Sequence, residues 1–292
     1  MIIYINGQWT EHQQAVVSVY DHGFLYGMGL FETFRTYGGK PFLLEEHLAR
    51  LEKDCRALDI RYSPDSSTIA AIIDSLLDKN QLSEAYIRLS VSAGIGEIGL
   101  PAEGYETPTV IVYGKPLPPR PDKWEKTARP LQRLKLSRNS PEAGWRMKSF
   151  HYMNNILAKR ELKQYPWISG TGAEGLLLNE KGYLAEGMVS NLFFVADGIC
   201  YTPALDTGIL PGITRDFVIR LCEARSVPVC VGHFDWDHLL AAEEVFVTNS
   251  VQEIIPINAL YDLGGHRRQV GSGEPGSLTR TLYEDYQRYC SL

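Results

Sequence analysis

The spacing of apolar residues predicts both helices and strands in the first part of the chain. Leucines recur at helical intervals between positions 44 and 58, which places them on one side of a helix. A second helix is expected over 69–77, because the residues at 64–67 form a capping signal just before it. Runs rich in β-branched and aromatic residues predict strands over 85–91 and 109–113.

The N-terminal residues alternate between apolar and polar, as a half-buried strand does. Ile3 and Ile5 precede an Asn-Gly turn at 6–7, and the valines within 16–19 continue the pattern beyond it. We therefore expect strand structure on both sides of this turn.

The stretch 94–99 matches the G-x-G-x-x-G pattern of dinucleotide-binding proteins and follows a predicted strand. That fingerprint also requires a helix that begins at the glycines. Pro101 and Gly104 come next, and the following expected element is a strand, so we reject a dinucleotide site here.

A proline-rich stretch at 115–122 predicts a semi-rigid linker. It separates a smaller N-terminal domain over 1–114 from a larger C-terminal domain over 123–292. Strands and helices follow in no regular βαβ order, which indicates an α+β fold. In the larger domain we expect four helices: one that ends near 165, one that begins near 213, one over 236–242 and one around 282. We expect strands over 174–179, 191–195, 227–231, 245–247 and 254–255.

Composition narrows the class of protein. The chain is 44% hydrophobic and 22% charged, with a formal net charge of −6, which is typical of a globular protein and predicts neither a nucleic-acid partner nor a membrane span. The N-terminus lacks the features of a signal peptide. Five cysteines without C-x-x-C spacing are expected to be reduced thiols of a cytoplasmic protein.

Four pieces of sequence could converge with Lys148 on one anionic, nitrogen-containing cofactor. A partly desolvated lysine beside another cation becomes a usable nucleophile and base, although an ordinary solvated lysine is the simpler alternative. The segment 212–214 opens a helix, where free N–H groups favour phosphate or merely form a cap. Small polar residues at 248–250 follow a strand, Arg50 offers a cation, and Glu186 could bond a protonated ring nitrogen or lie in an exposed turn.

Other chemistries have weaker support. The chain has no G-x-S-x-G nucleophile elbow and no P-loop motif. The segment 233–238 resembles a metal cluster, but strand alternation would point His233 and His238 apart, and a helix start capped by Asp235 explains it more simply.

In this order the motifs resemble those of the class IV (fold-type IV) pyridoxal-phosphate enzymes, along nearly the whole chain. The matching stretches are 21–27 with 31–33, 41–51, 148 with 152–155, 186–187 with 190–191, and 210–215. The resemblance implies a smaller N-terminal α/β sandwich, a larger C-terminal domain like a β-barrel with helices, a homodimer, and pyridoxal 5'-phosphate as cofactor. It also implies that Lys148 is the Schiff-base lysine and that Glu186 bonds the pyridine nitrogen.

The same resemblance assigns further cofactor contacts. It implies that Arg50, Ile213, Thr214 and Thr248 hold the phosphate and that Tyr152 approaches the phenolic oxygen of the ring. Ser190, Asn191 and Asn249 belong to the expected cofactor site as well.

Within the family the chain looks most similar to the aminodeoxychorismate lyases, on the stretches 138–141 and 146–149 and on Thr33. This branch converts a dianionic substrate, 4-amino-4-deoxychorismate, to 4-aminobenzoate and pyruvate. Thr33 would assist Lys148, and the expected substrate-binding residues are Tyr26, Arg88, Arg138 and Arg146. An aminotransferase for branched-chain or D-amino acids is the main alternative, and a non-catalytic binding protein on the same fold is a remote one.

Overall fold

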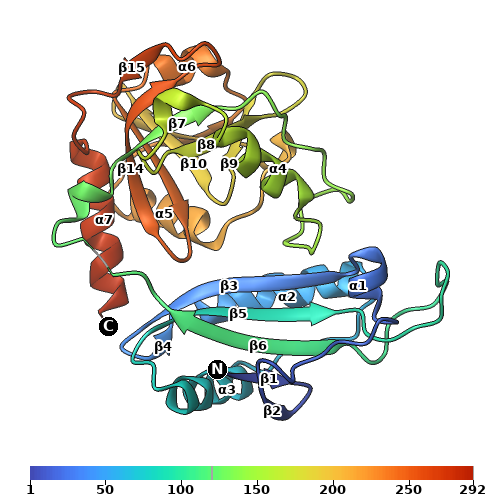
Figure 1. Ribbon diagram of the computed structural model, residues 1–292. Helices are drawn as coiled ribbons and strands as arrows, with labels where there is room; N and C mark the ends of the chain where they lie inside the picture. The colour runs from blue at the N-terminus through green and yellow to red at the C-terminus, as the bar shows by residue number, and fades with distance from the viewer. Residues whose placement is uncertain (120, 292) are drawn as a thin grey trace. The chain divides into compact units, whose positions relative to one another are not determined.

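The computed structural model describes residues 1–119 and 121–291 (Figure 1). By internal contacts the chain forms two units. The N-terminal unit comprises Met1–Pro118 and Met147–His151, and the C-terminal unit comprises Pro119–Arg146 and Tyr152–Leu292. The division falls inside the stretch for which a linker was predicted; Arg120 of that stretch and Leu292 lie outside the described residues. The short segment Met147–His151 belongs with the N-terminal unit, although the predicted boundaries put it in the larger domain.

An antiparallel sheet of six strands forms the N-terminal unit, in the order β2-β1-β6-β5-β3-β4. Its strands are β1 (Ile2–Ile5), β2 (Gln8–Glu11), β3 (Gly29–Tyr37), β4 (Lys40–Pro41), β5 (Ala85–Ser92) and β6 (Thr109–Pro116). Its helices are α1 (His22–Tyr26), α2 (Leu44–Ala57) and α3 (Ser66–Asn80). Helix α3 begins where the capping signal predicts, because the Asp65 side chain accepts a hydrogen bond from the Thr68 N–H.

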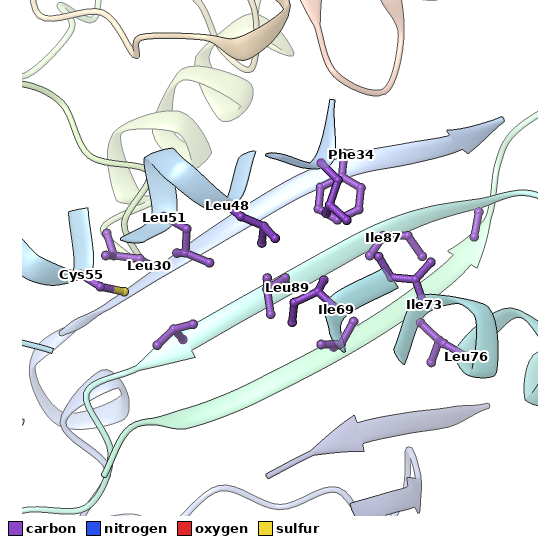
Figure 2. Close-up of a cluster of buried hydrophobic side chains, with 14 of the residues drawn as sticks. Leu30, Phe34, Leu48, Leu51, Cys55, Ile69, Ile73, Leu76, Ile87 and Leu89 are labelled. Carbon is purple, nitrogen blue, oxygen red and sulfur yellow. The ribbon is translucent and has the colours of Figure 1, made fainter. Parts of the chain in front are cut away.

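The core of this unit lies between the sheet and helices α2 and α3 (Figure 2). Leu30 and Phe34 of β3 contact this core, while Phe31 and Thr33 between them point to the opposite face by strand alternation. The leucine stripe of α2 is buried against the sheet, which confirms the predicted amphipathic helix.

The expectation of a strand at 16–19 is wrong. These residues form no regular element, and Val16 and Val19 are 77% and 64% exposed. Alternation is insufficient without a neighbouring strand, because a strand is stabilised by its ladder of hydrogen bonds and cross-strand side chains. The stretch 94–99 is irregular and the next element is a strand, β6, which confirms the predicted order of elements.

The C-terminal unit is built on a closed barrel of six strands. Its order is β7-β8-β9-β10-β13-β14, and closure comes from β9 with β10 and from β14 with β7. The barrel strands are β7 (Arg129–Arg133), β8 (Glu174–Leu178), β9 (Leu184–Gly187), β10 (Asn191–Ala196), β13 (Glu244–Asn249) and β14 (Glu253–Tyr261). Strands β11 (Ile199–Pro203) and β12 (Val229–Gly232) extend the sheet from β10, and β15 (Arg267–Gln269) pairs with β14.

The α-helices in the described part of this unit are α4 (Met153–Leu162), α5 (Ile213–Ala224), α6 (Trp236–Leu240) and α7 (Ser277–Cys290). Helix α6 starts with Asp235 as its N-cap, so the helix-start interpretation of 233–238 is confirmed. Closure of the barrel pairs Asn191 directly with Glu186, which brings two predicted cofactor residues together. Among the described residues, no helix combines the length and apolar character that a bilayer span requires.

Candidate active site

Backbone hydrogen bonds to β3 hold Lys148 in place. The Lys148 carbonyl accepts from the Phe31 N–H at 2.9 Å, and the Phe150 N–H donates to the Gly29 carbonyl at 2.9 Å. A bridge between Leu30 and Ser149 completes this antiparallel contact. A lysine far along the chain is therefore attached to the N-terminal sheet.

The Lys148 side chain shares an aromatic ring with a second cation. Its Nζ lies 4.7 Å from the centroid of the Phe31 ring, and Cζ of Arg88 lies 3.5 Å from the same centroid. Lys148 is half-buried, and Arg88 stands opposite Thr33 in the β3–β5 register. The lysine thus has the partly desolvated, cation-containing surroundings that its predicted role requires.

Thr33 and Tyr26 differ in the hydrogen bonds that their hydroxyl groups make with the described residues. The buried Thr33 Oγ1 has no hydrogen-bond partner among those residues. The Tyr26 hydroxyl accepts from the Gly99 N–H at 2.8 Å, and the Tyr26 carbonyl lies 3.3 Å from Nε2 of His151. Tyr26 therefore joins helix α1 both to the loop after β5 and to the segment that carries Lys148.

Arg50 projects from α2 onto the carboxylate of Glu32 in the middle of β3. Its Nε and Nη2 donate to the two carboxylate oxygens at 2.8 and 2.7 Å, and Nδ1 of His47 lies 2.6 Å from Oε2. Burial by itself raises the pKa of Glu32, but the charge of Arg50 and the hydrogen bonds from Arg50 and His47 outweigh it and lower the pKa to about 2. Burial lowers the pKa of His47, so this imidazole is neutral and donates from Nδ1.

Glu32 and His47 were missed as site residues. A signal was present, because an acid interrupts an apolar strand and a histidine lies three positions before Arg50 on the leucine-rich helix. Buried charged residues require partners, and residues three apart share a helix face.

Glu186 lies within β9 and is buried, so it is not an exposed turn residue. Its Oε1 accepts from Nε of Arg138 at 2.8 Å, and its Oε2 accepts from the Leu210 N–H at 2.9 Å. Nδ2 of Asn191 approaches Oε2 at 3.5 Å. Three donors thus hold the carboxylate in one orientation.

Arg138 and Arg146 are both buried, and the structure engages them inside the C-terminal unit. Arg138 also donates to Oδ1 of Asn154 at 2.8 Å, which ties Glu186 to helix α4. Arg146 donates to the carbonyls of Gly208 and Asn139. Burial and the neighbouring Arg138 lower the pKa of Arg146 to about 10. Both arginines therefore organise the surroundings of Glu186.

The start of α5 and the end of β13 offer donors for an anion. Gly212 is the N-cap of α5 and has no side chain to satisfy the first-turn N–H groups, which include that of Ile213. Thr214 Oγ1 shares a hydrogen bond of 3.1 Å with Ser250 Oγ. Thr248 is 1% exposed and its Oγ1 has no partner among the described residues. A Cβ on Gly212 would lie 1.9 Å from Oδ1 of Asn191, so only glycine fits at this approach.

The remaining predicted cofactor residues lie in the C-terminal unit. Ser190 Oγ donates to Oε1 of Glu174 at 3.2 Å, and Asn249 Oδ1 accepts from the N–H groups of Val251 and Gln252. Tyr152 is the N-cap residue of α4, and its carbonyl accepts from the Ile156 N–H. Glu174, which was not predicted, is buried, and burial raises its pKa.

The family model for class IV amino-transferases matches residues 29–260. The chain belongs to this family. Aminodeoxychorismate lyase of Bacillus subtilis (strain 168) is 41% identical to it over 289 residues, which cover 97% of this chain and 94% of that protein.

Two solved structures place the fold within the same class IV family. The 4-amino-4-deoxychorismate lyase from Pseudomonas aeruginosa has a TM-score of 0.83 and 29% identity, covering 98% of each chain. The branched-chain amino acid aminotransferase from Escherichia coli has a TM-score of 0.83 and 27% identity, covering 98% of this chain and 92% of that one. The predicted fold class, a two-domain fold-type IV architecture, is confirmed.

The residues present fit the cofactor expected of a class IV enzyme. A buried carboxylate with fixed orientation suits a protonated ring nitrogen. The hydroxyl of Thr248, which no described residue bonds, and the open first turn of α5 suit a phosphate. Within each unit, the structure brings predicted residues together: Lys148 with Arg88 in one, and Glu186 with Asn191 and the start of α5 in the other.

Proposed function

We propose that this chain is a pyridoxal-phosphate-dependent lyase that converts 4-amino-4-deoxychorismate to 4-aminobenzoate and pyruvate. The observation that carries the proposal is its 41% identity, over nearly the full length, to aminodeoxychorismate lyase of Bacillus subtilis. The Thr33 hydroxyl, which has no hydrogen-bond partner among the described residues, supports the same reaction as a candidate proton donor, because it lies on the face of β3 that carries Phe31, whose ring Lys148 contacts.

Lys148 would hold the cofactor through its amine, and Glu186 would hold the ring nitrogen. Arg50, the Ile213 N–H, Thr214 and Thr248 hold the phosphate, with contributions at the site from Tyr152, Ser190, Asn191 and Asn249. When bound, pyridoxal phosphate supplies an electron sink for charge that develops on the substrate carbon attached to nitrogen.

The amine of Lys148 would act as the general base once the amino group of the substrate has taken its place on the cofactor. It removes the proton from the ring carbon that bears the substrate amino group. The carbon–oxygen bond to the enolpyruvyl group then breaks, and the six-membered ring becomes aromatic. Protonation of the departing methylene carbon, by Lys148 or by a group at Thr33, yields pyruvate.

Arg88 is the first candidate for binding a substrate carboxylate. It lies beside Phe31 and opposite Thr33, and its Nε donates to Ser90 Oγ at 3.2 Å, which orients the guanidinium. Arginine matches a carboxylate through parallel N–H groups. Arg138 and Arg146 act on Glu186 and its surroundings, and Tyr26 holds the loop after β5 against α1.

The enzyme works as a homodimer in the cytoplasm, in folate biosynthesis. Large apolar side chains of the N-terminal unit support self-association because they are exposed together in three neighbouring stretches: 16–20, 24–25 and 95–100. All five cysteines are free thiols, in agreement with a reducing compartment.

A class IV aminotransferase is the second candidate function, favoured by the structural similarity to the branched-chain enzyme of Escherichia coli. The purified protein should be given 4-amino-4-deoxychorismate in one reaction, and an amino donor with a keto acid in another. We expect equal amounts of 4-aminobenzoate and pyruvate in the first. Consumption of the donor and keto acid without lyase products would establish the aminotransferase instead, and a protein without visible absorbance would be a binding protein on this fold.

A further inference from the structure

The Glu32–His47–Arg50 network is a buried charged cluster of the N-terminal unit that the reaction scheme leaves without a full role. Glu32 and His47 are each 1% exposed and the Arg50 side chain is 9% exposed. The carboxylate receives both Arg50 bonds and the His47 bond. Groups so deeply buried lose their hydration, so their mutual bonds replace it.

The geometry of the network fixes one guanidinium orientation. Nε and Nη2 engage the two carboxylate oxygens as parallel bonds, the arrangement in which an arginine fork has least rotational freedom. His47 lies one helical turn before Arg50 and binds Oε2, so α2 supplies both contacts to β3. Two of the five N–H donors that a guanidinium carries are engaged by Glu32.

We propose that Glu32 is a positioning residue that presents Arg50 to the cofactor phosphate in one orientation, and that His47 holds Glu32 in turn. This inference rests on the proposed role of Arg50 at the phosphate. A long, flexible arginine would otherwise have to be ordered when the cofactor binds, and preorganisation removes that loss of affinity. The network has no net charge, because Glu32 and Arg50 carry opposite charges and His47 is neutral.

The test compares two ligands that differ only in the phosphate. Dissociation constants of pyridoxal phosphate and of pyridoxal are measured by visible absorbance on apoenzyme refilled with each. Glu32→Gln keeps the size of the side chain but removes its charge and one acceptor. We expect it to weaken the binding of pyridoxal phosphate by about 10- to 100-fold, the usual effect of losing hydrogen bonds to a charged group. The dissociation constant of pyridoxal should stay unchanged.

A matched control lies in the C-terminal unit. Asp285 also receives Nε and Nη2 of one arginine, Arg225. Asp285→Asn removes the same kind of arginine–carboxylate pair away from the expected cofactor residues. It should change the dissociation constant of neither pyridoxal phosphate nor pyridoxal. An equal loss for both ligands in Glu32→Gln would make the network merely structural and overturn the inference.

Arg50→Lys separates the inference from the proposed function. It keeps the charge but removes the parallel N–H groups of the guanidinium, so it should selectively weaken the binding of pyridoxal phosphate. Adding Glu32→Gln to this variant should cause little further loss of affinity. If Arg50→Lys leaves the preference for the phosphorylated ligand intact, the phosphate role of Arg50 fails. If Arg50→Lys reduces the preference for the phosphorylated ligand but Glu32→Gln does not, only the positioning role of Glu32 fails. Should Glu32→Gln not fold, His47→Phe tests the same network, with a smaller loss confined to pyridoxal phosphate.

Discussion

Arg138 donates from Nε to Oε1 of Glu186 across 2.8 Å, and each side chain is 6% exposed. The pair joins the loop that leads toward Lys148 to strand β9 of the barrel. Because both charges are buried, each is the main compensation for the other. The substrate-binding role of Arg138 stays a prediction, whereas its bond to Glu186 is a feature of the structure.

Removal of Arg138 alone should destabilise the protein. We expect Arg138→Met to reduce the free energy of unfolding by about 3–5 kcal/mol, because it removes the closest cation from the buried Glu186 carboxylate and leaves only Arg146, whose Nε is 4.0 Å from Oε1. Urea unfolding of the C-terminal unit measures this. The double variant with Glu186→Gln should regain much of the loss. Arg61→Met, which breaks the exposed pair with Glu106, is the control and should cost less than about 1 kcal/mol.

Substitution of Lys148 should separate chemistry from folding. In Lys148→Ala, the visible absorbance of the purified protein and its lyase activity should both disappear, because the amine that binds the cofactor is gone. The far-UV circular dichroism should stay unchanged, since the half-buried side chain is not part of the core. Lys159→Ala, on the exposed side of α4, should keep full absorbance and activity. A coloured, active Lys148→Ala would refute the assignment.

Gly212→Ala should damage the start of α5. The added methyl would lie 1.9 Å from Oδ1 of Asn191, so Asn191 must move away from its bond to the Leu210 carbonyl. We expect a loss of about 1–3 kcal/mol in unfolding free energy, as for other overpacked sites, together with weaker binding of pyridoxal phosphate. Gly144→Ala is the matched control, because a Cβ there meets nothing within 4 Å. Equal behaviour of the two variants would contradict this close approach.

His47 should make stability depend on pH. Burial lowers its pKa in the folded state below the ordinary 6.5, so the unfolded chain binds the proton more readily. Stability is therefore present above 6.5 and is lost as pH falls below it, by about 1.4 kcal/mol per pH unit for one such group. Urea unfolding between pH 7 and pH 5 should show this slope, and His47→Gln should flatten it. An unchanged slope in the variant would mean that His47 does not titrate on unfolding.

Local patterns determined several elements correctly. The leucine spacing defined α2, the capping residues before 66 defined the start of α3, and Asp235 defined the start of α6. These features depend on neighbours within one or two helical turns, so a stretch of sequence contains all the contacts that decide them. Strands were also found where apolar runs were long, as in β5 and β10.

Patterns without local partners were ambiguous. The valines at 16–19 alternate like a strand, yet they pair with no strand in the described part of the chain, and their side chains are exposed. Glu186 could equally have been an exposed turn residue until barrel closure placed it opposite Asn191. The motifs in their order identified the family, but the sequence could not show which arginine faces which acid.

The sequence by itself determined most helices and strands and the class of protein, and it supplied a set of predicted site residues that lacked Glu32 and His47. Only the tertiary structure decided that Lys148 joins the sheet of the N-terminal unit, that Arg138 binds Glu186, and that Glu32 holds Arg50. The physical reason is the range of the contacts. Helix caps and apolar stripes form between near neighbours, whereas these pairs exist only after strand register and barrel closure bring distant segments together.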